Sequence, residues 1–216
     1  MPTNCLDHMK NGALQSGLYE VFDYSGNRYK VYCDLTSEPG MGWTLVISQS
    51  FKNRALSQFQ DPLFENSPLN QDTPRWDEYR LPLLRLQHLK TFSTYWRCTC
   101  NFDREGLLYR DYVRARISVF DFVSFNEKEL CMKVEYMDVR GHNCTGCTAA
   151  WWQFKESESK QNFLHHDSSV NKCEFGNTPV SVSSEDNFGL YSSVNSHFRC
   201  TATNLSTTNY WIGGRL

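Results

Sequence analysis

The sequence has 216 residues, of which 40% are hydrophobic and 14% are aromatic. This length and composition predict a folded chain with a sizeable core and exclude a disordered polymer. The formal net charge is -2, with acidic and basic residues interspersed along the chain. A nucleic-acid-binding protein needs a basic stripe or patch, so we expect no nucleic acid among its partners.

The sequence also lacks the features of a membrane protein. No apolar run approaches the roughly 18–20 residues of a membrane span. No signal-peptide core follows Met1, so we expect any leader or anchor to lie outside this sequence. We therefore expect no membrane insertion within this chain.

Cysteine is the strongest compositional signal. The nine cysteines are spread over the whole chain, at Cys5, Cys33, Cys98, Cys100, Cys131, Cys144, Cys147, Cys173 and Cys200. Cytosolic proteins of this size rarely carry so many unless they bind metal, so we expect an extracellular location. The odd count leaves at least one thiol free or paired with another chain, and a homo-oligomer is therefore one expected partner. Asn143 and Asn204 head sequons and are candidate glycosylation sites.

The first third of the chain predicts β-structure followed by a long loop. Residues 17–35 alternate around a turn at Ser25–Asn27, which is typical of a hairpin. Trp43–Ser48 predicts a short buried strand. Residues 51–74 are polar, contain proline and show no clean period, so we expect a long surface excursion there.

The rest of the chain predicts one helix and further strands. Leucines recur at near-helical spacing around Leu81–Lys90, and strand formers dominate residues 94–102, 112–123 and 130–139. The final third is rich in serine, asparagine and cysteine, with short aromatic segments, and predicts irregular structure held by disulfides. With no internal repeat, we expect a single domain over residues 1–216, α+β and mostly β, with short helices and a loop-rich C-terminal third.

The N-terminal quarter resembles the fibrinogen-related domains. Cys5, Ser16–Val21, Tyr29–Leu35 and Gly40–Val46 follow the opening subdomain of that family in order and spacing. The same opening block occurs in intelectin-type lectins. The resemblance implies a disulfide between Cys5 and Cys33, and a division into an N-terminal subdomain (1–50) and a divergent main body (51–216).

Beyond Ser50 the resemblance fades. The middle and C-terminal blocks are similar to secreted proteins of marine invertebrates that carry a fibrinogen-like opening on a divergent body. The family usually has an acidic calcium-binding loop and an aromatic pocket for acetylated or sugar ligands. The resemblance therefore implies carbohydrate as the ligand class and calcium as a cofactor.

The segment Arg140–Phe154 contains a C-x-x-C pair, Cys144 and Cys147, and a C-x-C pair lies upstream at Cys98 and Cys100. Four thiolates at tetrahedral geometry would make a structural zinc site. A thioredoxin-like redox site would need the C-x-x-C to open a helix within a βαβ unit, and no such pattern surrounds it. Because the other cysteines also need partners, we expect disulfides at both pairs.

The nearest acidic stretch for calcium is Glu185, Asp186 and Asn187, three consecutive oxygen-bearing side chains followed by Gly189. Calcium takes six to eight oxygens from such groups. Asp167 is a second candidate ligand. The alternative is that these segments are Asx-capped surface turns.

No catalytic pattern accompanies these residues. His165 and His166 are adjacent, so both rarely bind one ion, and we expect them to be exposed in a loop. The sequence has no G-x-S-x-G elbow, no P-loop and no G-x-G-x-x-G after a strand. We therefore expect no enzymatic activity.

The aromatic residues offer a ligand wall. Trp151 and Trp152 are adjacent, so on a strand one faces the core and the other faces outward. An outward Trp152 near Tyr191 or Trp211 would stack on the apolar face of a sugar. The alternative is that most of these rings belong to the core.

These observations predict a secreted or cell-surface recognition module that binds carbohydrate, with calcium assisting. The expected site residues are Trp152, Tyr191 and Trp211 for the ligand and Glu185, Asp186 and Asn187 for the ion. The expected partners are glycans or cell-surface and matrix glycoproteins. The alternative is a protein–protein adhesion or extracellular-matrix module without a sugar pocket.

Overall fold

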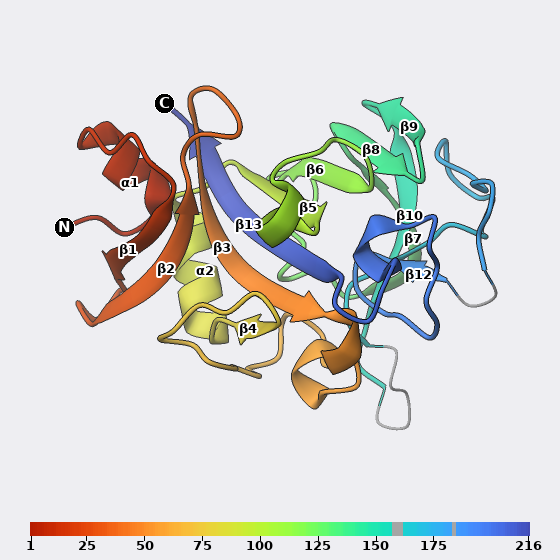
Figure 1. The fold of residues 1–216 in the computed structure, drawn as a ribbon, viewed down its shortest axis with the longest axis horizontal. Helices are drawn as coiled ribbons and strands as arrows, with labels where there is room; N and C mark the ends of the chain where they lie inside the picture. The colour runs from red at the N-terminus through yellow and green to blue at the C-terminus, as the bar shows by residue number, and fades with distance from the viewer. Residues whose placement is uncertain (157–161, 183–184) are drawn as a thin grey trace.

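A computed structural model describes residues 1–156, 162–182 and 185–216. Nine strands form one sheet at its centre, in the order β1-β2-β3-β13-β5-β6-β8-β9, with β4 paired to β3 (Figure 1). Their bounds are β1 (Gly17–Phe22), β2 (Arg28–Asp34), β3 (Met41–Ser50), β4 (Glu78–Arg80), β5 (Tyr95–Cys100), β6 (Tyr112–Arg116), β8 (Tyr136–Val139), β9 (His142–Thr145) and β13 (Thr207–Arg215).

Short elements surround this sheet. Two small sheets pair β7 (Glu127–Lys133) with β10 (Thr148–Gln153) and β11 (His166–Asp167) with β12 (Asp186–Asn187). The helices are α1 (Cys5–Lys10), α2 (Leu83–Thr91), α3 (Phe102–Glu105), η1 (Phe51–Asn53), η2 (Ser57–Phe59) and η3 (Arg199–Thr201). The predicted class, mostly β with short helices and a loop-rich C-terminal third, is confirmed. No helix in the described ranges is long and apolar enough to span a bilayer.

Strands β3 and β13 lie side by side through the middle of the molecule (Figure 1). Every residue of β3 is buried, as are Thr207–Gly214 of β13. Strand β13 also pairs with β5, so the last strand of the chain joins the N-terminal part to the main body. The prediction of irregular structure for this tail was wrong. Its residues are buried without alternation between faces, because both faces of a central strand are covered.

Three other predicted boundaries also change. The predicted strand over residues 112–123 ends at Arg116, and the one over 130–139 is divided between β7 and β8. The segment 51–74 is not simply a surface excursion, because its large apolar side chains Phe51, Phe59 and Leu63 are buried in the core. The hairpin, the buried strand β3 and the helix α2 lie where they were predicted.

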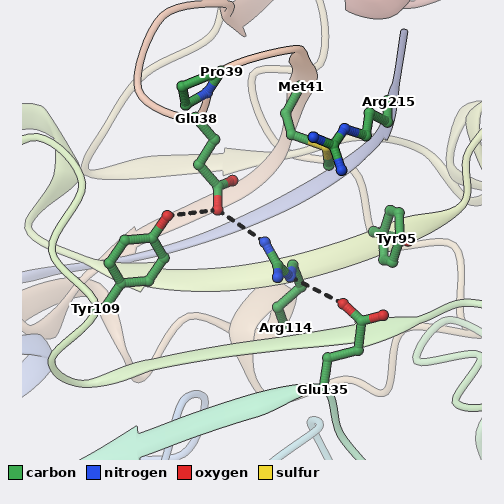
Figure 2. Close-up of a pocket in the computed structure, with 8 residues that line it drawn as sticks. All are labelled: Glu38, Pro39, Met41, Tyr95, Tyr109, Arg114, Glu135 and Arg215. Atoms are coloured by element: carbon green, nitrogen blue, oxygen red, sulfur yellow. Dashed lines mark hydrogen bonds and ion pairs between the residues drawn. The ribbon is translucent and has the colours of Figure 1, made fainter. Parts of the chain in front are cut away.

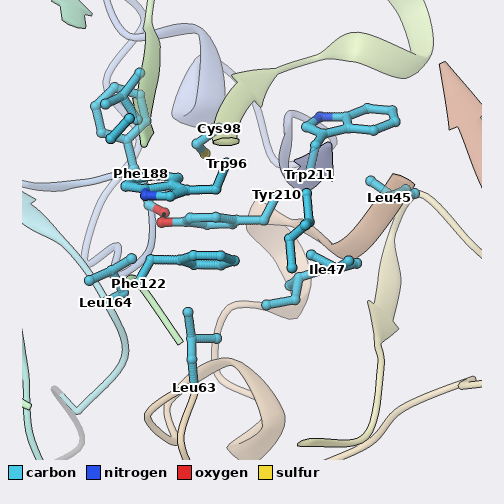
Figure 3. Close-up of a cluster of buried hydrophobic side chains, with 14 of the residues drawn as sticks. Leu45, Ile47, Leu63, Trp96, Cys98, Phe122, Leu164, Phe188, Tyr210 and Trp211 are labelled. Atoms are coloured by element: carbon cyan, nitrogen blue, oxygen red, sulfur yellow. Dashed lines mark hydrogen bonds between the residues drawn. The ribbon is translucent and has the colours of Figure 1, made fainter. Parts of the chain in front are cut away.

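Aromatic rings dominate the core between the sheet and the C-terminal loops (Figure 3). The Tyr210 ring stacks on Trp96 and on Phe122, with ring centroids 6.1 and 5.9 Å apart. Its hydroxyl donates a hydrogen bond of 2.5 Å to the carbonyl of Phe188. A buried tyrosine needs such a partner, so this contact fixes the loop around Phe188 against β13.

An ionic contact is buried beside these rings. Arg97 of β5 is fully buried and pairs with Asp34 at 2.5 Å and with Glu38 at 2.8 Å. Its guanidinium lies 4.5 Å from the ring centroid of Trp43 and 4.9 Å from that of Trp211. Burial acts to raise the pKa of Asp34, but Arg97 and hydrogen bonds from Ser37 bring it below its usual range. The Asp34 carboxylate therefore stays ionised, and its ion pair helps to hold the arginine between the two indoles.

Four disulfides link the chain: Cys5–Cys33, Cys100–Cys200, Cys131–Cys173 and Cys144–Cys147. The Cys5–Cys33 pairing, which the resemblance implied, is confirmed, and so is the bridge between Cys144 and Cys147. Cys98 is the exception, because it is a free, buried thiol. The expectation that the C-x-C pair would contribute both cysteines to disulfides was therefore wrong. Cys98 and Cys100 are two positions apart on β5 and so share a face of the sheet, but it is Cys100 that is bonded to Cys200.

Gly213 is required by the close approach of β13 to β3. A Cβ built there would lie 2.4 Å from the carbonyl oxygen of Gly42 and 2.6 Å from the Trp43 ring. We expect Gly213→Ala to lower the free energy of unfolding by about 2–4 kcal/mol, since an overpacked core must shift its backbone. Chemical denaturation measures this.

The matched control is Gly214→Ala, whose Cβ would meet the flexible end of Leu6 at 3.1 Å. We expect a much smaller loss for this variant. Equal stability of Gly213→Ala and the wild type would contradict the β3–β13 pairing described above.

The single free thiol gives a second prediction. Burial raises the pKa of the Cys98 thiol well above its usual value, and the side chain is inaccessible. We expect iodoacetamide to add no group to the native protein and one group after unfolding without reductant. Intact mass spectrometry counts the adducts, and two or more on the unfolded protein would contradict the four disulfides.

Candidate functional site

A cavity of about 240 Å³ lies where the η1–η2 segment meets the C-terminal loops. We call it the Asp186 cavity, and its lining residues are Arg54, Ala55, Gln60, Asp186, Leu190, Tyr191 and Ser192. Arg54 and Gln60 come from the ends of η1 and η2, whereas Asp186 lies on β12. Two residues that were predicted separately, Asp186 for an ion and Tyr191 for a ligand wall, therefore line one cavity.

Asp186 is the acidic residue that lines this cavity. It lies directly opposite Asp167 in the β11–β12 pair, and like charges in that position repel. Burial, then Asp167 and Glu185, raise the pKa of Asp186 from 3.8 to about 7. Within the described residues no cation pairs with its carboxyl group. This carboxyl group is therefore available to a ligand that donates hydrogen bonds.

The other walls of the Asp186 cavity are held in place. The Tyr191 hydroxyl lies 2.7 Å from Oγ1 of Thr208, so the side chain presents its ring rather than its hydroxyl. The Arg54 guanidinium lies 4.1 Å from the Phe51 ring centroid, and its Nη1 donates to the Phe51 carbonyl at 3.1 Å. Because the side chains are already ordered, a ligand would not have to order them on binding.

The predicted calcium ligands Glu185, Asp186 and Asn187 do not fit a calcium ion as a set. The Glu185 carboxylate is buried, pairs with Arg140 and accepts hydrogen bonds of 2.7 Å from both Asn187 and Asn195. Consecutive side chains on a strand also point to opposite faces, which separates Asp186 from its two neighbours. In the described parts of the chain, no three acidic, histidine or cysteine side chains come together as a metal site.

Glu185 therefore has a structural role. Together with Arg140 it ties the C-terminal loops to the end of β8, and Arg140 also reaches Thr178 and Ser168. A buried charge pair is retained where its remaining hydrogen bonds are satisfied, which is the case here.

The two predicted tryptophans do not line the Asp186 cavity. Trp211 is fully buried in β13, where its indole nitrogen donates to Oγ1 of Thr99 at 2.9 Å. The prediction that Trp211 forms part of a ligand wall was therefore wrong, because both faces of β13 are covered. Trp152 is half-buried on β10 and stacks on His165, with ring centroids 5.7 Å apart, whereas Trp151 belongs to the core.

The expectation that His165 and His166 are exposed was also wrong. Both are buried, and each ring bonds a backbone carbonyl, that of Phe163 or of Ala150, at 2.7 Å. Burial lowers the pKa of each from 6.5 to about 4, so both are neutral at physiological pH. The candidate glycosylation residues Asn143, on β9, and Asn204, in the turn before β13, are both exposed.

Arg54 and Gln60 were missed by the sequence analysis. They lie in the segment that was predicted as a surface excursion, and no pattern marks them. The only signal was that a long loop in a compact domain is often functional.

Comparison with known proteins also sets the N-terminal part of the chain apart from the main body. Residues 1–59 match the family model of the fibrinogen beta and gamma chains, C-terminal globular domain. The opening of this chain is therefore similar to the fibrinogen-related domains. No curated protein matches the chain significantly. Among solved structures, the fibrinogen-like globe domain of human ANGPTL2 aligns over 100% of both chains with 16% identity and a TM-score of 0.43, and we draw nothing further from it. A fibrinogen-related domain indicates a recognition or binding module.

The raised pKa of Asp186 predicts how stability depends on pH. Because the folded state binds this proton more tightly than the unfolded chain, the group stabilises the fold at acidic pH. That contribution is lost as the pH rises from about 4 through about 7. We expect Asp186→Asn to exceed the wild type in unfolding free energy by about 1–2 kcal/mol at pH 8, and to equal it near pH 4.

Urea denaturation of both proteins at several pH values measures this difference. Protonation of His165 and His166 destabilises the fold below about pH 6.5, but it affects both proteins and cancels. If the difference in unfolding free energy between the two proteins did not change with pH, this would contradict the raised pKa of Asp186.

Proposed function

We propose that this protein is a secreted or cell-surface recognition module that binds carbohydrate in the Asp186 cavity. The observation that supports the proposal is that Asp186 and Tyr191 meet Arg54 and Gln60 around one hollow. Four disulfides favour an oxidising compartment and hence an extracellular protein. We propose glycans, or the glycoproteins that carry them, as partners, and no catalytic step.

The chemistry of the walls suits a sugar. A carboxylate accepts hydrogen bonds from two neighbouring hydroxyls, and the guanidinium and amide donate to ring and hydroxyl oxygens. The Tyr191 ring offers an apolar surface for the C–H face of the sugar. At about 240 Å³ the cavity is smaller than the roughly 300–1,000 Å³ of drug-sized sites. It therefore suits one terminal sugar unit of a larger glycan.

Calcium dependence stays a prediction, but the carboxylates proposed to bind the ion are now those of Asp167 and Asp186. Asp167 and Asp186 are the two carboxylates that face each other across β11 and β12. A cation between them would relieve their repulsion, and a sugar hydroxyl would complete its oxygen ligands. Adding EDTA during a binding measurement tests this dependence separately from binding itself.

A glycan array followed by calorimetry on the best glycan tests the proposal. We expect specific binding by the wild type and a loss of at least about tenfold in affinity for Asp186→Ala, since a charge-assisted hydrogen bond is removed. Gln60→Ala should weaken binding less, because a neutral hydrogen bond contributes less.

The control is Glu20→Gln, which removes an exposed carboxylate on β1, far along the sheet from the cavity. It should bind as the wild type does. Loss of binding in the control as well, or unchanged binding by Asp186→Ala, would rule out the Asp186 cavity as the sugar site.

The second candidate function is protein–protein adhesion. It is favoured by exposed apolar side chains near the N-terminus, where Leu14 is 82% and Leu18 is 61% exposed. A blank array together with self-association in analytical ultracentrifugation would support adhesion. Self-association that Leu14→Ser and Leu18→Ser abolish would place the contact on this surface.

A further inference from the structure

A second cavity, of about 220 Å³, lies at the other end of the large sheet's central strands (Figure 2). We call it the Arg215 cavity, and its lining residues are Glu38, Pro39, Met41, Tyr95, Tyr109, Arg114, Glu135 and Arg215. They come from the β2–β3 loop, the start of β3, β5, the loop before β6, β6 itself, the turn between β7 and β8, and the end of β13. The Arg215 cavity shares no lining residue with the Asp186 cavity.

The Glu38 carboxylate in this cavity has no capacity left for a ligand. It accepts five hydrogen bonds, from the side chains of Trp43, Arg97, Tyr109, Tyr112 and Arg114. It is buried, so these contacts also hold Tyr109 and Arg114 in fixed positions. The buried ion pair between Glu38 and Arg97 therefore holds the residues of the Arg215 cavity in place before any ligand binds.

Glu135 is occupied in a similar way. One of its oxygens accepts from Nε of Arg114 at 3.1 Å, and the other accepts from Nε of Arg116 at 3.0 Å. Figure 2 shows Arg114 between Glu38 and Glu135, with Tyr95 and Arg215 to one side. The Tyr95 ring centroid also lies 5.9 Å from the Arg114 guanidinium and 5.3 Å from that of Arg116.

Cations exceed carboxylates around the Arg215 cavity. The ionic network from the core to the surface contains the carboxylates of Asp34, Glu38 and Glu135, and each of them is paired. Their partners are the guanidinium groups of Arg97, Arg114 and Arg116. Arg215 is one cation more, and its side chain has no ion pair or hydrogen bond with any residue that the structure describes, although its backbone pairs with Met41. The cavity therefore has an uncompensated positive charge at its rim, together with Nη2 of Arg114, which donates to no described residue.

A larger hollow of about 440 Å³ adjoins this cavity and shares Tyr109, Arg114 and Glu135 with it. Tyrosines dominate its wall. The Tyr109 ring centroid lies 5.2 Å from that of Tyr112 and 6.2 Å from that of Tyr136. Tyr109 is half exposed, so its ring is available for stacking next to the cationic rim.

We propose that the Arg215 cavity and the adjoining tyrosine hollow form a second binding site, for an acidic sugar residue. The carboxylate of the sugar binds Arg215 and Nη2 of Arg114, and the sugar ring stacks on Tyr109. A guanidinium is the group best suited to a planar carboxylate, and an aromatic ring to the apolar face of the sugar. This site is independent of the proposed function, because it uses other residues and another part of the fold.

Titration calorimetry with sodium glucuronate as the probe tests this inference, with glucose as the neutral match. We expect glucuronate to bind the wild type and glucose to bind at least about tenfold more weakly, since it lacks the charge-assisted contact. Arg215→Gln should weaken glucuronate binding by about tenfold, and Arg215→Lys by less. The affinity for glucuronate should also fall as salt is added.

The matched control is Arg28→Gln, which removes an exposed arginine on β2 whose ion pair among the described residues is with Glu20. It should leave glucuronate binding unchanged, and so should Asp186→Ala, which separates this site from the Asp186 cavity. Equal affinities for glucuronate and glucose, or an Arg215→Gln variant that binds as tightly as the wild type, would overturn the inference. Acetate or sulfate binding as tightly as glucuronate would also overturn it, because the site would then recognise a bare anion and not a sugar.

Discussion

The contact on which the rest of the fold depends is the buried guanidinium of Arg97. It lies between the indoles of Trp43 and Trp211, and it neutralises Asp34 and Glu38. Each of these groups comes from a different segment, so one side chain of β5 fixes the end of β2, the β2–β3 loop, β3 and β13 relative to one another. Removing the cation would leave the buried carboxylate of Asp34 without an ion-pair partner and Glu38 with Arg114 as its remaining one, and breaking a buried ion pair in this way is costly. The same contact holds Glu38, and Glu38 in turn holds the floor of the Arg215 cavity.

Both cavities follow from this arrangement. Strand β13 links the N-terminal subdomain to the main body, and a cavity is found towards each end of that strand. The Asp186 cavity is polar because two carboxylates face each other across a short pair of strands. The Arg215 cavity is cationic because its carboxylates are already paired with other arginines. The two sites therefore offer ligands opposite electrostatic environments on one small domain.

Much of the fold could be predicted from the sequence where local pattern decides the structure. The alternation around Ser25–Asn27, the apolar run of β3 and the leucine spacing of α2 each specify an element without tertiary information. Strand β13 could not be recognised in this way, because a strand covered on both faces does not alternate. Its role depends on pairing with residues more than a hundred positions away.

The candidate site was predictable in part for the same reason. Asp186 and Tyr191 were recognised because an exposed acidic turn and an aromatic segment are local features. Glu185 has the same local features, but Arg140 occupies it, and that contact is visible only in three dimensions. Arg54, Gln60 and Arg215 belong to no pattern, since a lone polar residue acquires a role only from the residues that the fold places beside it.

The position of β13 in the sheet has a consequence for biosynthesis. The strand at the centre of the sheet is also the last strand to be synthesised, and the Cys100–Cys200 bridge waits for a cysteine just before it. Until that point β3 and β5 expose unpaired edges, and Cys98 and Cys100 are both free thiols two positions apart on β5. Long-range pairing of this kind folds slowly and leaves aggregation-prone surface exposed. The domain therefore completes its folding only after most of it has left the ribosome, when Cys200 must pair with Cys100 and not with the nearby Cys98.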